Sequence, residues 1–378
     1  MLILIILAIE TIYSAGFSHQ QHMFRHARVS PITSVPNNKQ SVDISQPRYE
    51  PNETLRESIK NMVTIINSTN HKMELSDKCS SIVHIIGTGL TPSLFSLPLS
   101  TLHLLSQADV VLYDSLGLSY HDICQIVSRD CAVVCVGKRG DSAESWKQKD
   151  IDEFVVEMAL QTDTDREIQQ KPRIIVRLKG GDPFLFGRTR SEIETLRTNN
   201  IPYTYTPAIS SCIAGPHLGG IPLTDAELNC QSFGVWSGTD AFGRSFGLND
   251  GRQNANFGSN VDVLVFLMIG RLDKLEALCQ LLSSGSESGD SSSSMHRSKW
   301  NLDTPCAVIQ NAGGISDNIA QTYCNIEGQI PIQKVWRSTL GDIVSTIRSE
   351  DETRTSLSPA VFVVGRVCEL DLTCDRTK

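Results

Sequence analysis

The sequence predicts an α/β protein built from two domains, and three observations support this. From about Cys79 onward, short runs rich in Val, Ile and Leu alternate with amphipathic segments, the pattern of parallel strands joined by helices. A hinge-like stretch, "TPAISSCIAGPHLGGIPLT" (206–224), separates these runs into two groups. The chain has 378 residues, 40% of them hydrophobic, which is enough apolar material for two ordinary cores.

The first predicted domain spans residues 79–206. Its strand candidates are "IVHII" (82–86), "DVVLY" (109–113), "AVVCV" (132–136), "RIIVRL" (173–178) and "YTYT" (203–206). Between them, "QKDIDEFVVEMALQ" (148–161) and "RSEIETLRT" (190–198) have apolar residues at helical spacing.

The second predicted domain spans residues 207–372. Its strand candidates are "SFGVW" (232–236), "VDVLVFLMI" (261–269), "PCAVI" (305–309), "NIAQTYCNI" (318–326) and "AVFVVG" (360–365). Two stretches, near 243–260 and 283–300, are too polar and too rich in Gly and Ser to bury a face, and we expect them to be mobile surface insertions.

Residues 1–78 have the composition of a leader followed by a disordered linker. The opening "MLILIILAIETIYSAGF" is an apolar run too short to span a membrane and is typical of a secretory signal. The next stretch has no acidic residue until Asp43, as in organelle transit peptides. This pair of segments resembles the bipartite leader of a complex plastid, so we expect a plastid protein without a membrane anchor in its mature form. Mitochondrial import is the alternative.

Charge and cysteine content exclude some classes of function. The net charge of -8 argues against a nucleic-acid-binding protein, because such proteins neutralise phosphates with a basic surface. The 11 cysteines include no C-x-x-C pair and no zinc-type cluster, so we expect reduced thiols and no metal site.

Two glycine-containing turns follow predicted strands. "IIGTG" (85–89) carries bare backbone to a strand end, where it can approach a ligand. Pro92 stands where the dinucleotide fingerprint has its third glycine, which makes an NAD-dependent dehydrogenase the weaker alternative.

The second turn, "GGDPFLFGR" (180–188), is more specific. Gly180 and Gly181 remove side chains at a strand end, and Asp182 can accept hydrogen bonds from a ligand. A helix-entry loop capped by Asp182 explains Asp-Pro but not the double glycine with its flanking Phe residues. We therefore interpret this stretch as a ligand-binding loop.

The sequence resembles the tetrapyrrole methylase family from about Ile82 to Leu370, and within it the members that methylate uroporphyrinogen III. The resemblance rests on "GTG" (87–89), "QADVVLYDSL" (107–116), "VGKRG" (136–140), "VRLKGGDPFLFGR" (176–188), "IPYTYTPAISS" (201–211), "GIPLT" (220–224), "VFLM" (265–268) and "VVGRV" (363–367). It implies a two-domain tetrapyrrole methylase fold with the active site in the interdomain cleft, a homodimer, and S-adenosylmethionine as the cofactor.

The resemblance also implies roles for individual residues. Asp114 matches the proposed proton acceptor and Lys138 the proposed donor of the catalytic pair. The alternative for Asp114 is a cap of the next helix. The positions that match cofactor contacts are Gly87, Gly89, Leu90, Gly180, Gly181, Asp182, Leu185, Ser210, Ser211, Met268 and Ala312. Of these, Leu90 stands where the family has proline, and Ala312 where it has glycine.

The chemistry of the residues agrees with these roles. A pyrrole carbon that attacks a sulfonium methyl group must later lose a proton, which suits a carboxylate base such as Asp114. The eight carboxylates of such a tetrapyrrole call for cations, and the substrate-binding candidates are Arg139, Arg177, Lys179 and Arg188. Solvated surface charges are the alternative for these four.

Some positions depart from the family pattern. "GTGLTPS" (87–93) lacks an expected proline and acid, and "DAEL" (225–228) lacks two expected basic groups. The sequence predicts an S-adenosylmethionine-dependent methyltransferase that converts uroporphyrinogen III to precorrin-2 in siroheme biosynthesis. A methylase of a later cobalamin precursor and a non-catalytic cofactor- or tetrapyrrole-binding homologue are the alternatives.

Overall fold

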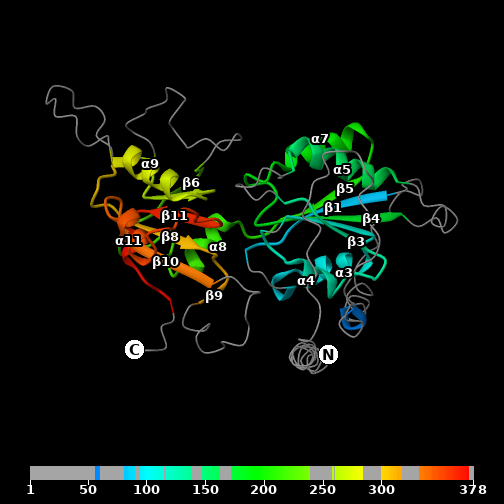
Figure 1. The fold of residues 1–378 in the computed structure, drawn as a ribbon, viewed down its shortest axis with the longest axis horizontal. Helices are drawn as coiled ribbons and strands as arrows, with labels where there is room; N and C mark the ends of the chain where they lie inside the picture. The colour runs from blue at the N-terminus through cyan, green and yellow to red at the C-terminus, as the bar shows by residue number, and fades with distance from the viewer. Residues whose placement is uncertain are drawn as a thin grey trace. The chain divides into compact units, whose positions relative to one another are not determined.

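The computed structural model describes residues 56–59, 81–90, 94–114, 116–137, 146–161, 172–238, 258, 260–283, 299–316 and 332–373. The chain divides into two compact units, Met1–Ala208 and Ile209–Lys378 (Figure 1). The division falls two residues beyond the predicted boundary at 206. Each unit has its own sheet and its own core.

The described part of the first unit contains a five-stranded sheet in the order β3-β2-β4-β1-β5. All of its strand pairs are parallel. The strands are β1 (Ser81–Gly87), β2 (Val110–Tyr113), β3 (Ala132–Cys135), β4 (Arg173–Lys179) and β5 (Tyr203–Thr206). The five predicted strands of this domain are confirmed. They could be recognised as apolar runs because the inner strands of a parallel sheet are covered on both faces.

Helices cover both faces of this sheet, as Figure 1 shows. One face packs against α3 (Leu99–Gln107) and α4 (Tyr120–Cys124). A short 3₁₀ turn at Leu94–Ser96 precedes α3 in the chain. The other face packs against α5 (Gln148–Leu160) and α7 (Thr189–Thr198), which confirms the two predicted helices. Side chains alternate between the faces along each strand, so Val176 and Leu178 face α3 while Ile175 faces α5.

A short segment far upstream also belongs to this unit. Residues 56–59 form a helical turn, and Ile59 is only 1% exposed, within the core on the α3 face. Arg56 donates a hydrogen bond from Nη2 to the carbonyl oxygen of Ser106 at 3.3 Å. This segment lies inside the stretch 1–78 that the sequence assigned to a leader and linker. The packing of Ile59 corrects that assignment for residues 56–59, whereas the apolar start lies outside the described residues.

The described part of the second unit contains a six-stranded sheet in the order β6-β7-β11-β8-β10-β9. The strands are β6 (Phe233–Ser237), β7 (Val263–Leu267), β8 (Pro305–Gln310), β9 (Ile315–Ser316), β10 (Ile332–Thr339) and β11 (Ala360–Val364). Four predicted strands are confirmed, and the candidate at 318–326 lies outside the described residues. The sheet is mixed, because β11 runs antiparallel to both β7 and β8. The expectation of parallel strands therefore holds for the first unit only.

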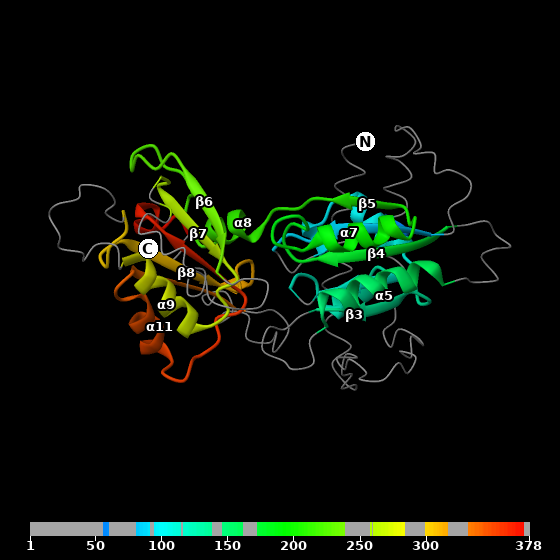
Figure 2. The same cartoon turned by 90° about the horizontal axis from the view of Figure 1, so that it is seen from above.

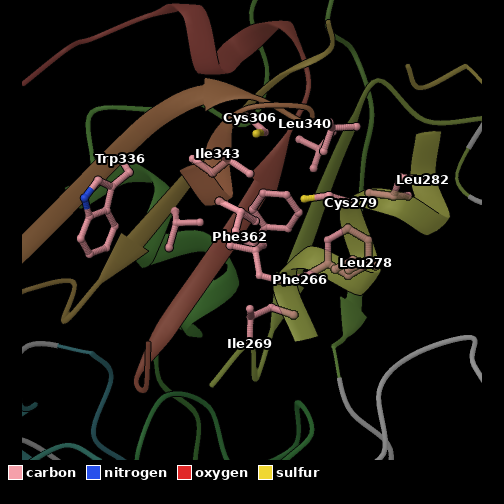
Figure 3. Close-up of a cluster of buried hydrophobic side chains, with 14 of the residues drawn as sticks. Phe266, Ile269, Leu278, Cys279, Leu282, Cys306, Trp336, Leu340, Ile343 and Phe362 are labelled. Atoms are coloured by element: carbon pink, nitrogen blue, oxygen red, sulfur yellow. The ribbon is translucent and has the colours of Figure 1, made fainter. Parts of the chain in front are cut away.

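The core of the second unit lies between its sheet and two helices, α9 (Leu272–Ser283) and α11 (Ile343–Glu350). Phe266 and Phe362 stack at its centre with ring centroids 5.9 Å apart (Figure 3). Helix α8 (Ser211–Leu218) contacts β7 and β11, and it occupies part of the stretch predicted as a hinge (Figure 2). A 3₁₀ turn at Arg366–Glu369 follows β11.

An ion pair joins the residues that border the two polar insertions. Asp262 follows the first insertion and accepts hydrogen bonds from the backbone nitrogens of Gln231 and Ser232 at 3.0 and 3.1 Å. Lys299 follows the second insertion, and its Nζ lies 2.9 Å from Asp262 Oδ1. The second insertion is shorter than predicted, because Ser283 ends α9 and Trp300 is buried in the core. Residues 239–257 and 284–298 lie outside the described part of the chain.

Candidate functional site

Strand ends that carry glycine gather at one edge of the first sheet. Parallel strands place their carboxyl ends at the same edge, which is where α/β proteins bind ligands. The turns after β1 and β4 meet there: Gly89 and Gly181 exchange two backbone hydrogen bonds, of 3.2 and 2.8 Å. Both glycines have a φ of 67°, a left-handed conformation that favours glycine.

Gly87 is packed closely against its neighbours at this edge. A Cβ atom added to it would lie 2.7 Å from the carbonyl oxygen of Gly181 and 2.8 Å from both Ala208 Cβ and Pro183 Cδ. No side chain larger than hydrogen fits without a shift of the backbone. The predicted glycine turns are therefore packed against one another, and Leu90, which follows them, is half-buried.

Asp114 lies at the end of β2 and holds the turn after β4. Its two carboxylate oxygens each lie 3.0 Å from the backbone nitrogen of Gly180, which donates to them. The side chain is half-buried. Ser119, and not Asp114, caps the next helix, so the capping alternative for Asp114 is wrong. The structure thus brings one member of the predicted catalytic pair to Gly180, while Lys138 lies outside the described residues.

Asp182 also binds backbone groups. Its Oδ1 accepts from the nitrogen of Phe184 at 2.9 Å, and its Oδ2 accepts from the nitrogen of Ala208 at 3.1 Å. The capping residue position of α7 is taken by Arg188, so Asp182 does not cap that helix. The carboxylate instead ties the turn after β4 to the segment after β5.

The tip of the same loop carries exposed apolar side chains. Phe184 packs edge-on against Tyr205, with ring centroids 4.9 Å apart. Leu185 and Phe186 are exposed beside them. The predicted contact residue Leu185 is therefore accessible to a ligand.

Two of the predicted substrate-binding cations are buried. Arg177 and Lys179 are only 3% and 4% exposed, since both point from β4 toward α7. Lys179 Nζ forms an ion pair with Glu192 Oε1, and Arg177 Nε lies 3.6 Å from Glu192 Oε2. Burial and the neighbouring Arg177 lower the pKa of Lys179, while Glu192 opposes that shift. The structure does not support a role for either cation in binding a substrate at the surface.

The other two predicted cations differ from these. Arg188 is exposed, with a left-handed φ of 53° at the start of α7. Arg139 lies outside the described residues.

A second buried carboxyl group extends the cluster around Glu192. Gln148 Nε2 donates to Asp152 Oδ1 at 2.7 Å and to Glu192 Oε1 at 3.3 Å. Ser191 also donates to Asp152, and burial raises the pKa of Asp152 against these hydrogen bonds. Neither Glu192 nor Asp152 is among the site residues predicted from the sequence. The available signal was the position of Glu192 on the buried face of α7, between Thr189 and Leu196.

In the second unit, two predicted contact residues begin helix α8. Ser210 is the N-cap, and its side chain accepts a hydrogen bond from the nitrogen of Cys212 at 3.4 Å. Ser211 is the first helical residue and is half-buried. The position of Ser210 is explained by capping, which does not require a ligand.

The other two predicted contacts lie after strands of the second sheet. Met268 follows β7, is 46% exposed and has a φ of 62°, which is rare for a residue with a side chain. Ala312 follows β8 between Asn311, at a φ of 51°, and Gly313, at a φ of 85°. Since β7 and β8 both run antiparallel to β11, their carboxyl ends lie at the same edge. Both positions therefore present an irregular backbone at that edge.

The described residues contain no group of three or more His, Cys, Asp or Glu side chains that could hold a metal ion. Eight of the cysteines lie in the described part of the chain, all as free thiols. No helix in that part is long and apolar enough to cross a membrane.

Comparison with known families shows to which family the chain belongs. Residues 83–322 match the sequence model of the Tetrapyrrole (Corrin/Porphyrin) Methylases, more than half of the chain. The chain is a tetrapyrrole methylase. The match includes Gly87, Asp114 and the turn at Gly180, so the carboxyl edge of the first sheet lies within the methylase region.

Individual relatives support this membership. The chain is 32% identical to the uroporphyrinogen-III C-methyltransferase of Methanocaldococcus jannaschii, over 70% of this chain and 87% of the relative. It is 30% identical to the uroporphyrinogen-III C-methyltransferase of Synechococcus elongatus, over 76% of this chain and 94% of the relative. It is also 32% identical to the siroheme synthase of Psychrobacter cryohalolentis, but covers only 48% of that protein. The methylase thus spans about half the length of that siroheme synthase.

Solved structures show the same fold. The uroporphyrin-III C-methyltransferase of Thermus thermophilus, complexed with S-adenyl homocysteine, matches with a TM-score of 0.50 and 23% identity, over 76% of this chain and 99% of that one. The cobalamin biosynthetic enzyme cobalt precorrin-4 methyltransferase matches with a TM-score of 0.53 and 17% identity, over 79% and 99%. These likenesses establish the tetrapyrrole methylase fold.

Proposed function

We propose that this methylase transfers two methyl groups in succession from S-adenosylmethionine to carbon atoms of uroporphyrinogen III, giving precorrin-2 for siroheme biosynthesis. The observation that carries the proposal is the likeness to two uroporphyrinogen-III C-methyltransferases at 30% identity or more, over most of each relative. A later cobalamin precursor is less favoured as the substrate, because the likeness to the cobalt precorrin-4 enzyme is 17% and concerns the fold.

The residues present fit such a cofactor. Gly89 and Gly181 offer backbone without side chains at the carboxyl edge, and Leu185 offers an exposed apolar side chain beside it. Met268 and Ala312 of the second unit offer an exposed thioether side chain and a small side chain. We propose that these residues, with Ser211, contact the cofactor. When bound, it supplies a methyl group on a sulfonium centre.

In this proposal Asp114 is the base that removes a proton from the tetrapyrrole after methyl transfer. A carboxylate suits that step, because the attack of a pyrrole carbon on the methyl group leaves the pyrrole ring cationic, and loss of a proton from another atom of the tetrapyrrole restores neutrality. The hydrogen bonds from Gly180 fix the direction of the carboxylate while leaving lone pairs on both oxygens. Lys138 is the proposed proton donor. Arg139 and Arg188 are the remaining candidates for pairing with substrate carboxylates.

The experiment is a methyl-transfer assay with the purified full chain, uroporphyrinogen III and cofactor labelled in the methyl group. We expect two labels in each product molecule. If the protein binds the cofactor but no label enters the tetrapyrrole, the non-catalytic binding protein becomes the better description. A control reaction with a tetrapyrrole that is already methylated twice tests the alternative of a later precursor.

We also propose that the methylase forms a homodimer and is imported into a plastid. The family resemblance supports the first, and the apolar start and acid-poor stretch before Asp43 support the second. Light scattering on the purified protein measures the assembly, and a fluorescent fusion locates it. A monomeric mass would overturn the first proposal, and a cytosolic or mitochondrial signal the second.

A further inference from the structure

The peptide unit between Lys179 and Gly180 is held from three directions. The carbonyl oxygen of Lys179 accepts hydrogen bonds from Thr88, from the backbone nitrogen at 2.9 Å and from Oγ1 at 3.2 Å. The nitrogen of Gly180 donates to Asp114 at 3.0 Å. The side chain of Lys179 reaches into the protein and pairs with Glu192. This one peptide therefore links the turn after β1, the end of β2 and helix α7.

Burial makes the third contact different from a surface ion pair. Glu192 is 2% exposed, and it is the carboxylate that contacts both Lys179 and Arg177, two cations on the same face of β4. Two buried cations repel each other, and a carboxylate between them offsets that repulsion. A long lysine side chain would otherwise be free to turn toward water. The pair with Glu192 thus fixes the direction of the Lys179 side chain away from the ligand edge.

The Glu192 carboxylate is itself held by residues of helix α5. Gln148 and Asp152 come from α5, and Gln148 donates to both Asp152 and Glu192. The hydrogen bond from Gln148 therefore opposes movement of the Glu192 carboxylate together with Lys179. The cluster contains two cations, Arg177 and Lys179, and two carboxyl groups, Asp152 and Glu192.

We propose that Glu192 is a positioning residue, which acts through Lys179 to fix the peptide between Lys179 and Gly180. By fixing this peptide, Glu192 also fixes the turn after β4, where cofactor contacts are proposed, and the carboxylate of Asp114. Glu192 touches neither ligand nor reacting atoms. The kinetic consequence rests on the proposed function, whereas the effect on the peptide does not.

The experiment compares Glu192→Gln with the matched control Glu194→Gln in the full chain. Glu194 lies on the same helix but forms an exposed pair with Arg190. Amide hydrogen exchange reports on Thr88 and Gly180, whose N–H groups are bonded to Lys179 and Asp114. We expect faster exchange at these two amides and a loss of about tenfold to a hundredfold in cofactor affinity and kcat in Glu192→Gln, as for a small misplacement of a reactive geometry. Glu194→Gln should match the wild type.

A second variant separates positioning from stability. Arg177→Met and Lys179→Met combined with Glu192→Leu remove both buried cations and the carboxylate that they share, and apolar replacement of a whole buried ionic cluster is often neutral for stability. We expect the melting temperature of this triple variant to return toward the wild type, while the fast exchange of Gly180 and the weak cofactor binding remain. Recovery of cofactor binding and kcat together with the melting temperature would overturn the proposal, as would wild-type exchange at Thr88 and Gly180 in Glu192→Gln.

The two proposals fail in different ways. A wild-type protein that transfers no methyl group overturns the proposed function, but the exchange comparison still tests the role of Glu192. An active wild type with unchanged exchange in both variants overturns the role of Glu192 alone.

Discussion

Both carboxylate oxygens of Asp114 lie 3.0 Å from the backbone nitrogen of Gly180. Asp114 therefore fixes the turn after β4, in addition to the role of base that we propose for it. The two roles can be separated, because an amide side chain keeps one acceptor oxygen but is a very poor proton acceptor.

For Asp114→Asn we expect turnover to fall by about a hundredfold or more, as for lost general-base assistance, with cofactor affinity close to that of the wild type. For Asp114→Ala we expect both to fall, because the N–H of Gly180 loses its partner, which costs about 1–3 kcal/mol if the group stays buried. Methyl-transfer kinetics and calorimetric titration measure the two effects. Normal turnover in the Asn variant would remove Asp114 from the catalytic role.

Gly87→Ala tests the close contact between the glycine turns. The new Cβ would meet the carbonyl oxygen of Gly181 at 2.7 Å, so the turns must separate. We expect a loss of about 1–3 kcal/mol in the free energy of unfolding, as for overpacking, together with weaker cofactor binding. Gly270→Ala is the control, since its Cβ would meet only Ser358 Cβ at 3.6 Å, an ordinary contact. Equal stability of the two variants in chemical denaturation would contradict this account.

We expect His84 to make the stability of the first unit depend on pH. Its side chain is buried on β1, with Nδ1 at 2.6 Å from Thr204 Oγ1, and burial lowers its pKa from the ordinary value of 6.5. As the pH falls through about 6.5, the unfolded chain takes up a proton that the folded protein does not. The folded state therefore has its full stability above that pH and loses part of it progressively as the pH falls below it.

The measurement is the melting temperature between pH 7.5 and 5.5 for the wild type and His84→Gln. We expect a steeper decline in the wild type. Burial lowers the pKa of His103 in the same direction, so the difference between the two proteins isolates His84. Parallel curves would show that His84 does not contribute.

The burial of Ile59 predicts that residues 56–59 contribute to the stability of the folded protein. Truncation of a fully buried Ile to Ala leaves a cavity and typically costs about 2–5 kcal/mol. We expect Ile59→Ala to lower the melting temperature, and a chain that starts at Cys79 to lower it at least as much. The exposed neighbour Glu57 provides the control Glu57→Ala. A chain that starts at Cys79 and melts like the full chain would contradict this prediction.

The sequence predicts those parts of the fold whose signals are local. The strands of the first sheet read as apolar runs because they are buried, and the turns at Gly87 and Gly180 are visible because only glycine tolerates such contacts. Strand β10 was missed because Trp336 is its one buried side chain among half-buried and exposed neighbours, so its pattern resembles a loop.

Partners distant in sequence were not predictable in the same way. Arg177 and Lys179 were taken for surface cations, because their burial depends on Glu192 from α7 and on how that helix packs against β4. Ile59 was assigned to a linker although Leu55, Ile59, Met62 and Val63 have helical spacing, because the composition of the preceding stretch was taken to extend to residue 78. The first error concerns a tertiary contact and the second a local signal, and both leave the location of the carboxyl edge unchanged.

The ion pair between Lys299 and Asp262 has a consequence for engineering. Asp262 and Lys299 each follow one of the two polar stretches. Asp262 also accepts hydrogen bonds from the backbone nitrogens of Gln231 and Ser232, just before β6. The residues that follow the two polar stretches are thus held in place by each other, and added chain length between fixed residues costs little free energy. Residues 239–257 and 284–298 are therefore the natural places to graft a fluorescent reporter or an affinity handle without disturbing the glycine turns where chemistry is proposed.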